Sequence, residues 1–465
     1  MISLVKEDIV RKKLCIIISC VLIFLGIVMI IPVTGQIFLT ITEKLLHRRI
    51  SLGSALLSRI QFLGISTCIF SIIFCCLYSI SIIDIMNKDK VVILLLIFLL
   101  IQFVISNVYL VFNKEMTGNG FDFGDFFYSV WTCNRSSINL YPPLAELYYR
   151  TLRLLVPSSI LKVEDYQLLR QSFEGCYLLI INSLVSIIPF IMLTHQALKK
   201  KDEFKILFVL ALCLSGPFMF AIFRSNILLI AFNFALLFYI SYDSEKKWVK
   251  ELGLISLGIS FALKLYPAVL GVILLKDKRW KDTVRCALYG LLLLFLPMLF
   301  FEKGFLEIIN LLKGAENFTE SGFNYLTGTL SLKSNLYFIF SRISSSRSLF
   351  KLFYSVVLFV YFVISIFIII KAQRKWHVWY VLASACYIVP GLSWPYVAIF
   401  LTIPLIEIIN DSNYEKIDFL VLIIFFLIFC YDRAFSFALI CPLLTFVLHI
   451  IIFVTNWQSN YRGAN

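Results

Sequence analysis

The sequence has few of the residue patterns that soluble enzymes use to bind metals and nucleotides. It contains no P-loop, no dinucleotide-binding fingerprint and no internal repeat of roughly 20–50 residues. Its four histidines are scattered without the spacing of metal ligands (His47, His195, His377 and His449). We therefore expect no metal site and no bound cofactor, and a divalent cation is not predicted.

The cysteines do not predict a disulfide framework. Most of the twelve lie within apolar runs, where a thiol acts as a small apolar side chain. Cys133 and Cys176 are the exceptions, since both fall in or beside a polar segment, and one disulfide between them is compatible with the sequence.

Apolar residues dominate the chain. Of its 465 residues 60% are hydrophobic, and the mean hydropathy is +0.91. Runs of about 20 apolar residues recur along its length, and each can cross a hydrocarbon core of roughly 30 Å as a helix. The runs lack the alternation of barrel strands, so helices must satisfy the backbone polar groups in lipid. We predict an all-α polytopic membrane protein, one domain over residues 1–465, with about 12 spanning helices.

The charge distribution gives an orientation. A formal net charge of +14 does not indicate nucleic acid here, because basic residues gather at the cytoplasmic ends of membrane spans. Lys6 and Arg11 precede the first apolar run, which places the N-terminus in the cytoplasm of a cell-membrane protein, and the same rule places the C-terminus there. Residues 113–175 and 302–349 then form two large outer loops. The short loops 199–201, 244–250, 371–377 and 411–418 are predicted to face the cytoplasm.

The predicted spans follow from the same pattern. After the first outer loop they lie at about 176–198, 206–222, 226–242, 284–301, 350–370, 378–392 and 396–409, followed by two more spans. No inverted halves with matching broken helices appear, which disfavours a transporter.

One apolar run, 252–275, has basic clusters at both ends, and a single crossing cannot place both on the cytoplasmic side. The run is interrupted by Lys264-Leu265-Tyr266-Pro267, and proline bends a helix and removes a donor. A re-entrant hairpin with Lys264 near its tip resolves the conflict, because twelve helical residues reach roughly 18 Å. The alternative is a single kinked span with one cluster on the wrong side.

Two acids lie in a polar stretch between apolar runs, residues 119–144. Asp122 and Asp125 are surrounded by aromatic side chains that would lie well at a membrane interface. A carboxylate held among aromatic rings is partly desolvated, which raises its pKa and makes it a better base. Paired carboxylates also permit a hydrolase, and two solvated loop acids are the structural alternative.

A helix is predicted at 143–156, with proline at its start. One face is apolar (Leu144, Leu147, Tyr148, Leu152 and Leu155), and Glu146, Arg150 and Arg153 line the other. This pattern is typical of an interfacial helix that touches anionic headgroups. A helix that only anchors the loop is equally compatible with it.

Three basic residues are candidate anion contacts. Lys264 lies in an apolar run, where a charge costs about 2.5 kcal/mol or more, so it indicates a functional site. A snorkelling lysine or a partner for a buried acid is the alternative. Arg224 lies in the predicted outer turn 224–226, and Arg342 lies in the second outer loop.

At this point the sequence resembles a known family. In chain order it contains D-F-x-x-F-F (122–127), Y-P-P-L (141–144), A-L-K-L-Y-P-A (262–268) followed by K-D-K-R-W-K, and L-S-W-P-Y (392–396) with Pro404. Their order over about 115–410 resembles glycosyltransferase family 87, integral-membrane transferases of the GT-C fold similar to polyprenol-phosphate-mannose-dependent mannosyltransferases. The resemblance implies that Asp122 is the catalytic base and that Lys264 matches the lysine of a K-x-x-P element.

The sequence also departs from the family. Arg224-Ser225 stands where the family often has Gly-Gln, and Tyr396 stands where it often has His. These differences affect the identity of the sugar and the acceptor more than the fold.

Together, the residues and the resemblance predict an inverting glycosyltransferase. It would move a mannose-like hexose from a polyprenyl-phosphate donor to a cell-envelope glycan or glycolipid, on the outer face and among membrane lipids. Asp122 and Asp125 would act on the acceptor, and Lys264, Arg224 and Arg342 would bind the donor phosphate. Tyr141, Pro142, Tyr266, Trp394 and Tyr396 would line the substrate pocket. A polysaccharide polymerase or ligase using lipid-linked glycans is the alternative, and a lipid or solute transporter is another.

Overall fold

The structure is a computed structural model. It describes residues 123–133, 141–161, 169, 172–307, 309, 312–313, 329–341, 343, 346–391, 393–411, 415–429 and 437–462. The three spans predicted before the first outer loop, at about 14–32, 61–82 and 91–112, lie outside the described residues, as do Asp122 and Arg342.

Every regular element in these ranges is a helix. In chain order they are α6 (Gly124–Thr132), α7 (Pro143–Arg153), α8 (Ser158–Leu161), α10 (Phe173–Ala197), α11 (Asp202–Cys213), α12 (Gly216–Arg224), α13 (Leu228–Ser241), α14 (Lys247–Leu263), η2 (Tyr266–Gly271), α15 (Val272–Lys276), α16 (Trp280–Phe295), η3 (Leu296–Phe300), η4 (Gly304–Leu306), α18 (Leu332–Phe340), α19 (Arg347–Lys371), α20 (Lys375–Ile388), η5 (Pro395–Leu401), α21 (Thr402–Asn410), α22 (Lys416–Phe429) and α23 (Phe437–Arg462). Elements labelled η are short 3₁₀ helices.

Three of the described helices are long and apolar enough to cross a membrane: α10, α16 continued by η3, and α19. The pair α11 and α12, bent by 59°, makes a fourth if it is counted as one span. All four lie where spans were predicted. The all-helical fold and its apolar helices identify a membrane protein, and the total of about 12 spans stays a prediction.

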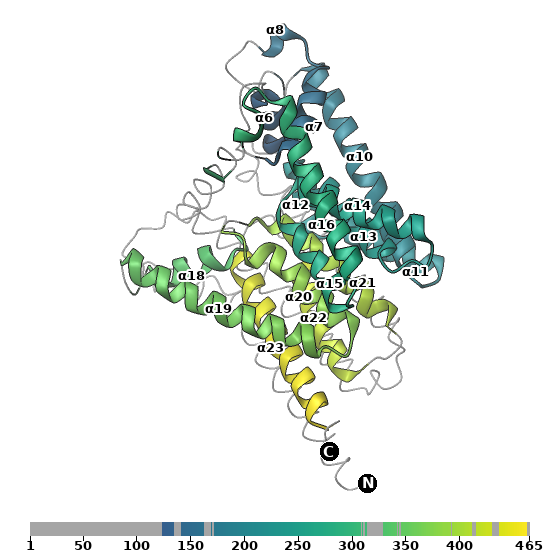
Figure 1. Ribbon diagram of the computed structural model, residues 1–465, viewed down its shortest axis with the longest axis vertical. Coiled ribbons are helices and arrows are strands. Elements are labelled where there is room, and N and C mark those ends of the chain that lie inside the picture. The colour runs from purple at the N-terminus through teal and green to yellow at the C-terminus, as the bar shows by residue number, and fades with distance from the viewer. Residues whose placement is uncertain are drawn as a thin grey trace, which may run out of the picture.

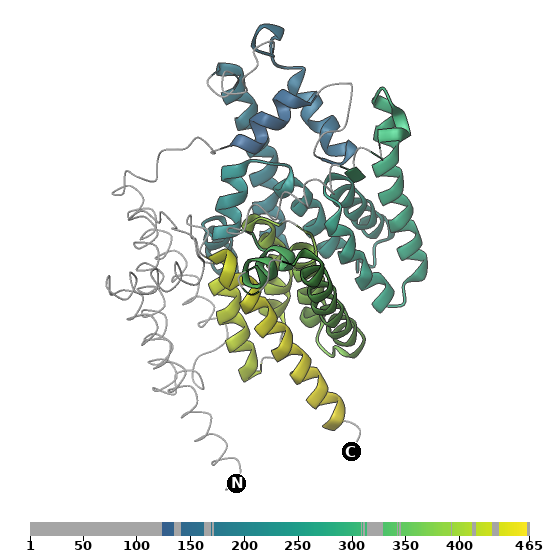
Figure 2. The same cartoon turned by 90° about the vertical axis from the view of Figure 1, so that its left-hand side faces the viewer.

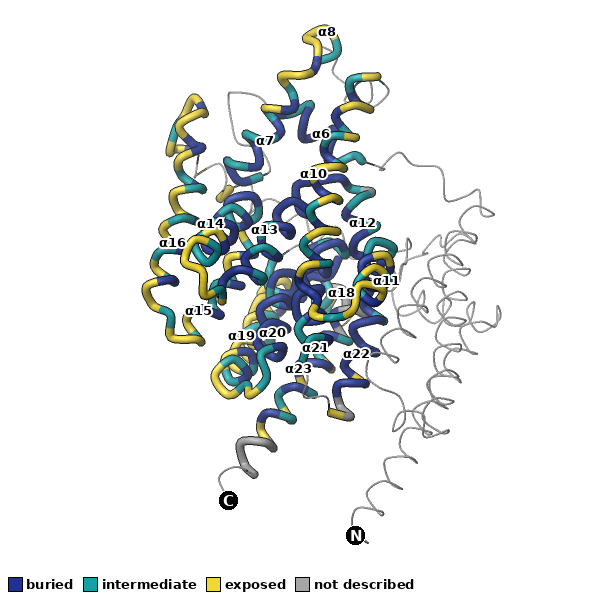
Figure 3. Tube along the Cα trace, turned by 90° about the vertical axis from the view of Figure 1, so that its right-hand side faces the viewer, coloured by how far each residue is buried: buried dark blue, intermediate teal, exposed yellow. Residues whose placement is uncertain are grey.

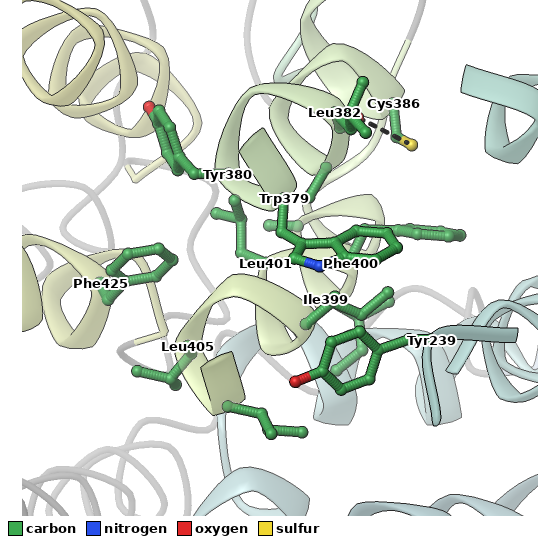
Figure 4. Close-up of a cluster of buried hydrophobic side chains, with 14 of the residues drawn as sticks. Tyr239, Trp379, Tyr380, Leu382, Cys386, Ile399, Phe400, Leu401, Leu405 and Phe425 are labelled. Atoms are coloured by element: carbon green, nitrogen blue, oxygen red, sulfur yellow. Dashed lines mark hydrogen bonds between the residues drawn. The ribbon is translucent and has the colours of Figure 1, made fainter. Parts of the chain in front are cut away.

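The core surrounds α20, whose side chains are buried on nearly every side. It packs against η5, α21 and η2. Trp379 of α20 lies against Tyr239 of α13, with ring centroids 5.3 Å apart, beside Phe400 of η5 (Figure 4). In contrast, α19 is largely exposed (Figure 3). Only 17% of its most apolar 18-residue stretch is buried in the protein. A helix that is apolar all round suits the interior of a bundle, and an exposed apolar helix suits lipid.

The chain turns back within 252–275, as the predicted hairpin requires, and its re-entrant placement in a membrane stays a prediction. α14 ends at Leu263 with Lys264 as its cap, and η2 runs back along it: a methyl group added to Gly271 would lie 3.3 Å from Leu257 Cδ2. At the base, Lys250 Nζ lies 3.8 Å from Asp282, which follows the hairpin in the chain. Both ends of the hairpin therefore lie at one end of the molecule, with Lys264 at the tip.

The loops that were predicted to share a side do share one. Arg374, just before α20, pairs with Asp411 and Asp418 at 2.7 and 2.6 Å. Lys375 pairs with Asp243 at 3.1 Å, and the side chain of Asn410 bonds to the backbone where α10 ends. The helices α6, α7 and α8 lie at the opposite end, as Figures 1 and 2 show. Which end faces the cytoplasm stays a prediction of the charge rule.

Candidate active site

A carboxylate and a guanidinium from distant parts of the chain form an ion pair at the α6–α7 end of the molecule. Asp125, in the first turn of α6, places its Oδ2 atom 3.2 Å from Nε of Arg224 at the end of α12. Asn226 donates a hydrogen bond from Nδ2 to the same oxygen, also at 3.2 Å. The two charged side chains are 23% and 18% exposed, so the pair is screened by water only in part.

The turn that carries Arg224 and Asn226 is held by two helices, α7 and α10. Ser225 has φ 51°, in the left-handed region that few residues other than glycine adopt. Asn182 of α10 donates to its carbonyl oxygen at 3.0 Å, and Tyr148 of α7 donates to Asn182 at 2.7 Å. The next amide, that of Ile227, donates to the hydroxyl oxygen of Tyr149 at 2.9 Å. Helices α7 and α10 thus fix the direction of the Arg224 side chain.

The prediction that the charged face of α7 contacts lipid headgroups was wrong. Glu146 is buried and accepts a hydrogen bond from the Tyr141 amide at 3.4 Å. Arg150 donates to the carbonyl oxygen of Phe300 at 3.3 Å, and Arg153 donates to two carbonyl oxygens at the end of α6. The polar side chains of α7 therefore bind protein, because α6 and η3 pack where lipid headgroups were expected.

Lys264 extends from the hairpin tip towards Tyr141 and Asp125. Its Nζ atom lies 4.2 Å from the centroid of the Tyr141 ring, a cation–π contact. It lies within electrostatic range of the Asp125 carboxylate as well. Burial, helped by Tyr149 and Asp125, raises the pKa of the Tyr141 phenol well above its usual value, so this ring stays neutral beside the lysine.

Trp394 and Tyr396, from the motif at 392–396, lie beside these charged side chains. The Arg224 guanidinium lies 5.1 Å from the Trp394 ring centroid, and Tyr396 lies within electrostatic range of Asp125 and Arg224. Tyr266 lies beside Tyr396, and its buried hydroxyl has no hydrogen-bond partner among the described residues.

The structure therefore brings together most of the predicted site. The gathered residues are Asp125, Tyr141, Pro142, Arg224, Lys264, Tyr266, Trp394 and Tyr396. Pro142 is buried directly before α7, next to Tyr141. Asp122 precedes Phe123, the cap of α6, and both Asp122 and Arg342 lie outside the described residues, so their predicted roles stay predictions.

Three contributors were missed. Asn226, Tyr149 and Asn182 bind the acid or hold the turn. Asn182 had a visible signal, since an amide side chain within an apolar run must find a polar partner. Tyr149 had none, because its spacing alone does not tell which face of α7 is covered.

The disulfide that the sequence allowed between Cys133 and Cys176 is not formed. Cys133 and Cys176 are both free thiols. Cys133 is buried at the end of α6, where its Sγ donates to the Val130 carbonyl oxygen at 3.2 Å, whereas Cys176 is exposed on α10. The two side chains therefore lie in different environments and do not bond.

The arrangement suits an anionic ligand that also carries a polar, non-ionic group. Lys264 and Arg224 offer two positive charges to such a ligand. The aromatic rings offer flat apolar surfaces beside those charges. A carboxylate lies next to both.

A comparison with protein-family models matches residues 140–393 to glycosyltransferase family 87. The matched range includes Tyr141, Arg224 and Lys264, and it ends one residue before Trp394. Comparisons with curated proteins and with solved structures gave no match.

Proposed function

Because the chain belongs to glycosyltransferase family 87, we propose that it transfers a mannose-like hexose from a polyprenyl-phosphate donor to a cell-envelope glycan or glycolipid. The family membership makes it a membrane glycosyltransferase, and the transporter alternative is set aside. The donor class rests on one observation: two cations from separate elements, Lys264 and Arg224, meet beside a carboxylate and neutral aromatic rings.

The donor phosphate binds between Lys264 and Arg224 in this proposal. When the bond between the anomeric carbon and the phosphate oxygen breaks, the electron pair stays on that oxygen and the phosphate gains negative charge. Two positioned cations stabilise this charge more in the transition state than in the ground state, which accelerates the step.

The acceptor hydroxyl loses its proton to Asp122 in the same proposal. Its oxygen then attacks the anomeric carbon from the side opposite the phosphate, in one inverting displacement. Asp125 supports the choice of Asp122 indirectly, because Arg224 and Asn226 already occupy the Asp125 carboxylate. Both contacts hold Asp125 beside Arg224, so Asp125 is assigned to positioning Arg224.

The site lies on the outer face in this proposal. The basic loops gather at the other end of the molecule, and positive charge marks the cytoplasmic side. The first outer loop (113–175) then supplies Asp122, Asp125 and Tyr141, the second (302–349) supplies Arg342, and both chain ends are cytoplasmic.

The proposal is tested in purified protein reconstituted in nanodiscs. A short-chain polyprenyl-phosphate hexose is supplied with an envelope glycolipid fraction, and release of polyprenyl phosphate is measured. Mass spectrometry of envelope glycans from a deletion strain identifies the acceptor. Sugar transfer from a nucleotide donor in place of the lipid-linked one would refute the donor class.

A further inference from the structure

An apolar groove of about 350 Å³ lies between the α14–α15 hairpin and α16, which run side by side in Figure 1. Its volume lies within the range of small-molecule sites, about 300–1,000 Å³. Gly258 and Gly290 allow the two helices to approach, since a methyl group added to Gly258 would lie 3.1 Å from the Gly290 backbone nitrogen. Phe261 and Ala268 line the end nearest the hairpin tip.

One end of the groove lies at the hairpin tip that carries Lys264. Phe261 and Ala268, which line that end, lie three residues before and four residues after Lys264. From there it follows α16 from Leu291 back to Thr283, about 12 Å at 1.5 Å per residue. It therefore runs away from the site and towards the ion pairs at the hairpin base.

This direction fits an amphiphilic ligand. A lipid whose phosphate binds Lys264 extends its hydrocarbon chain away from the outer surface and towards the bilayer centre. The groove offers an apolar surface along that path, and Lys264 lies at the hairpin tip near its upper end. Ala268 and Ala287 in its wall are exposed, so a chain can enter sideways from the bilayer.

We propose that this groove binds the first part of the prenyl chain of the donor, which selects lipid-linked donors by their chain as well as by their phosphate. The inference rests on the proposed polyprenyl-phosphate donor and adds a subsite to it. A long-chain donor, which fills the groove of about 12 Å, then gains affinity that a short-chain donor, whose prenyl chain is too short to fill it, does not. Each buried methylene group contributes about fourfold in affinity.

The test fills the groove from its exposed wall. Ala287→Phe adds a ring in the groove, and Leu288→Phe is the matched control, because Leu288 is the next residue of α16, is 58% exposed and does not line the groove. We expect Ala287→Phe to raise KM for a long-chain donor about tenfold, with KM for a short-chain donor and kcat unchanged. Leu288→Phe should change neither KM.

Equal effects of Ala287→Phe on both donors, or no effect on either, would overturn the groove proposal while the wild-type turnover still supports the proposed function. Wild-type protein that uses neither donor would instead overturn the proposed function. A photoreactive polyprenyl phosphate provides a second readout that needs no turnover and should label α14–α16. If a photoreactive phospholipid labels the groove and polyprenyl phosphate does not compete, the groove is a general lipid site and the proposal fails.

Discussion

Replacing Lys264 by alanine removes the cation at the hairpin tip and leaves the rest of the site in place. The side chain is half-buried over the Tyr141 ring, and its backbone amide still donates to Ser260 as the cap of α14. Alanine keeps this amide, so the hairpin should fold. The variant should lose the contact with the donor phosphate and little else.

The expected loss follows from the charge. A pair of unit charges about 4 Å apart in a partly buried site contributes about 4 kcal/mol at an effective dielectric constant of about 20. That energy corresponds to roughly a thousandfold in rate. Arg224 remains to share the phosphate charge, so we expect turnover to fall by about 10²–10³. Lys264→Arg should keep part of the activity, because the charge remains while the guanidinium is larger and planar.

The assay is donor-concentration kinetics in nanodiscs with a short-chain polyprenyl-phosphate hexose. Lys281→Ala is the matched control, since it removes an exposed lysine near the base of the same hairpin, far from the site. The control should behave as wild type. Unchanged kinetics of Lys264→Ala would make Lys264 a structural charge, and the phosphate site would then be sought around Arg224 and Arg342.

Three further predictions concern the acids, the topology and the turn. Asp122→Asn should abolish transfer without changing the size-exclusion profile, because an amide cannot accept the acceptor's proton, whereas Asp125→Asn should be milder; an indispensable Asp125 and a dispensable Asp122 would reverse the assignment. Single cysteines in place of Asn119 and Lys247 should be labelled by an impermeant reagent from opposite sides of the membrane, and labelling of both from one side would refute the orientation. Tyr149→Phe should lower stability by about 1–3 kcal/mol in a thermal unfolding assay and reduce turnover, because the buried Ile227 amide loses its acceptor; wild-type stability and turnover would show that the turn does not depend on this bond.

Local sequence patterns predicted the hairpin and the position of its lysine. Two basic clusters at the ends of one apolar run cannot both be cytoplasmic after a single crossing, and Pro267 gave the place of the bend. Charge placement and backbone geometry are local rules, so they can be read from one segment. The grouping of the short basic loops at one end followed from the same rule.

Contacts between distant segments could not be predicted in this way. Asp125 and Arg224 pair across 99 residues, a distance over which spacing in the sequence carries no information. The faces of α7 were misassigned for a related reason. Periodicity shows that a helix has two kinds of face, but Arg150 and Arg153 bind carbonyl groups of neighbouring helices whose positions only the fold defines.

The hairpin of α14, η2 and α15 has a consequence for how the chain is threaded. The hairpin enters and leaves at the same end of the molecule. It therefore does not change the end at which α16 or any later helix begins. Shortening both limbs by the same number of residues would withdraw Lys264 from the site without inverting α16 or any helix after it. The depth of the lysine can therefore be changed without changing the topology of the chain.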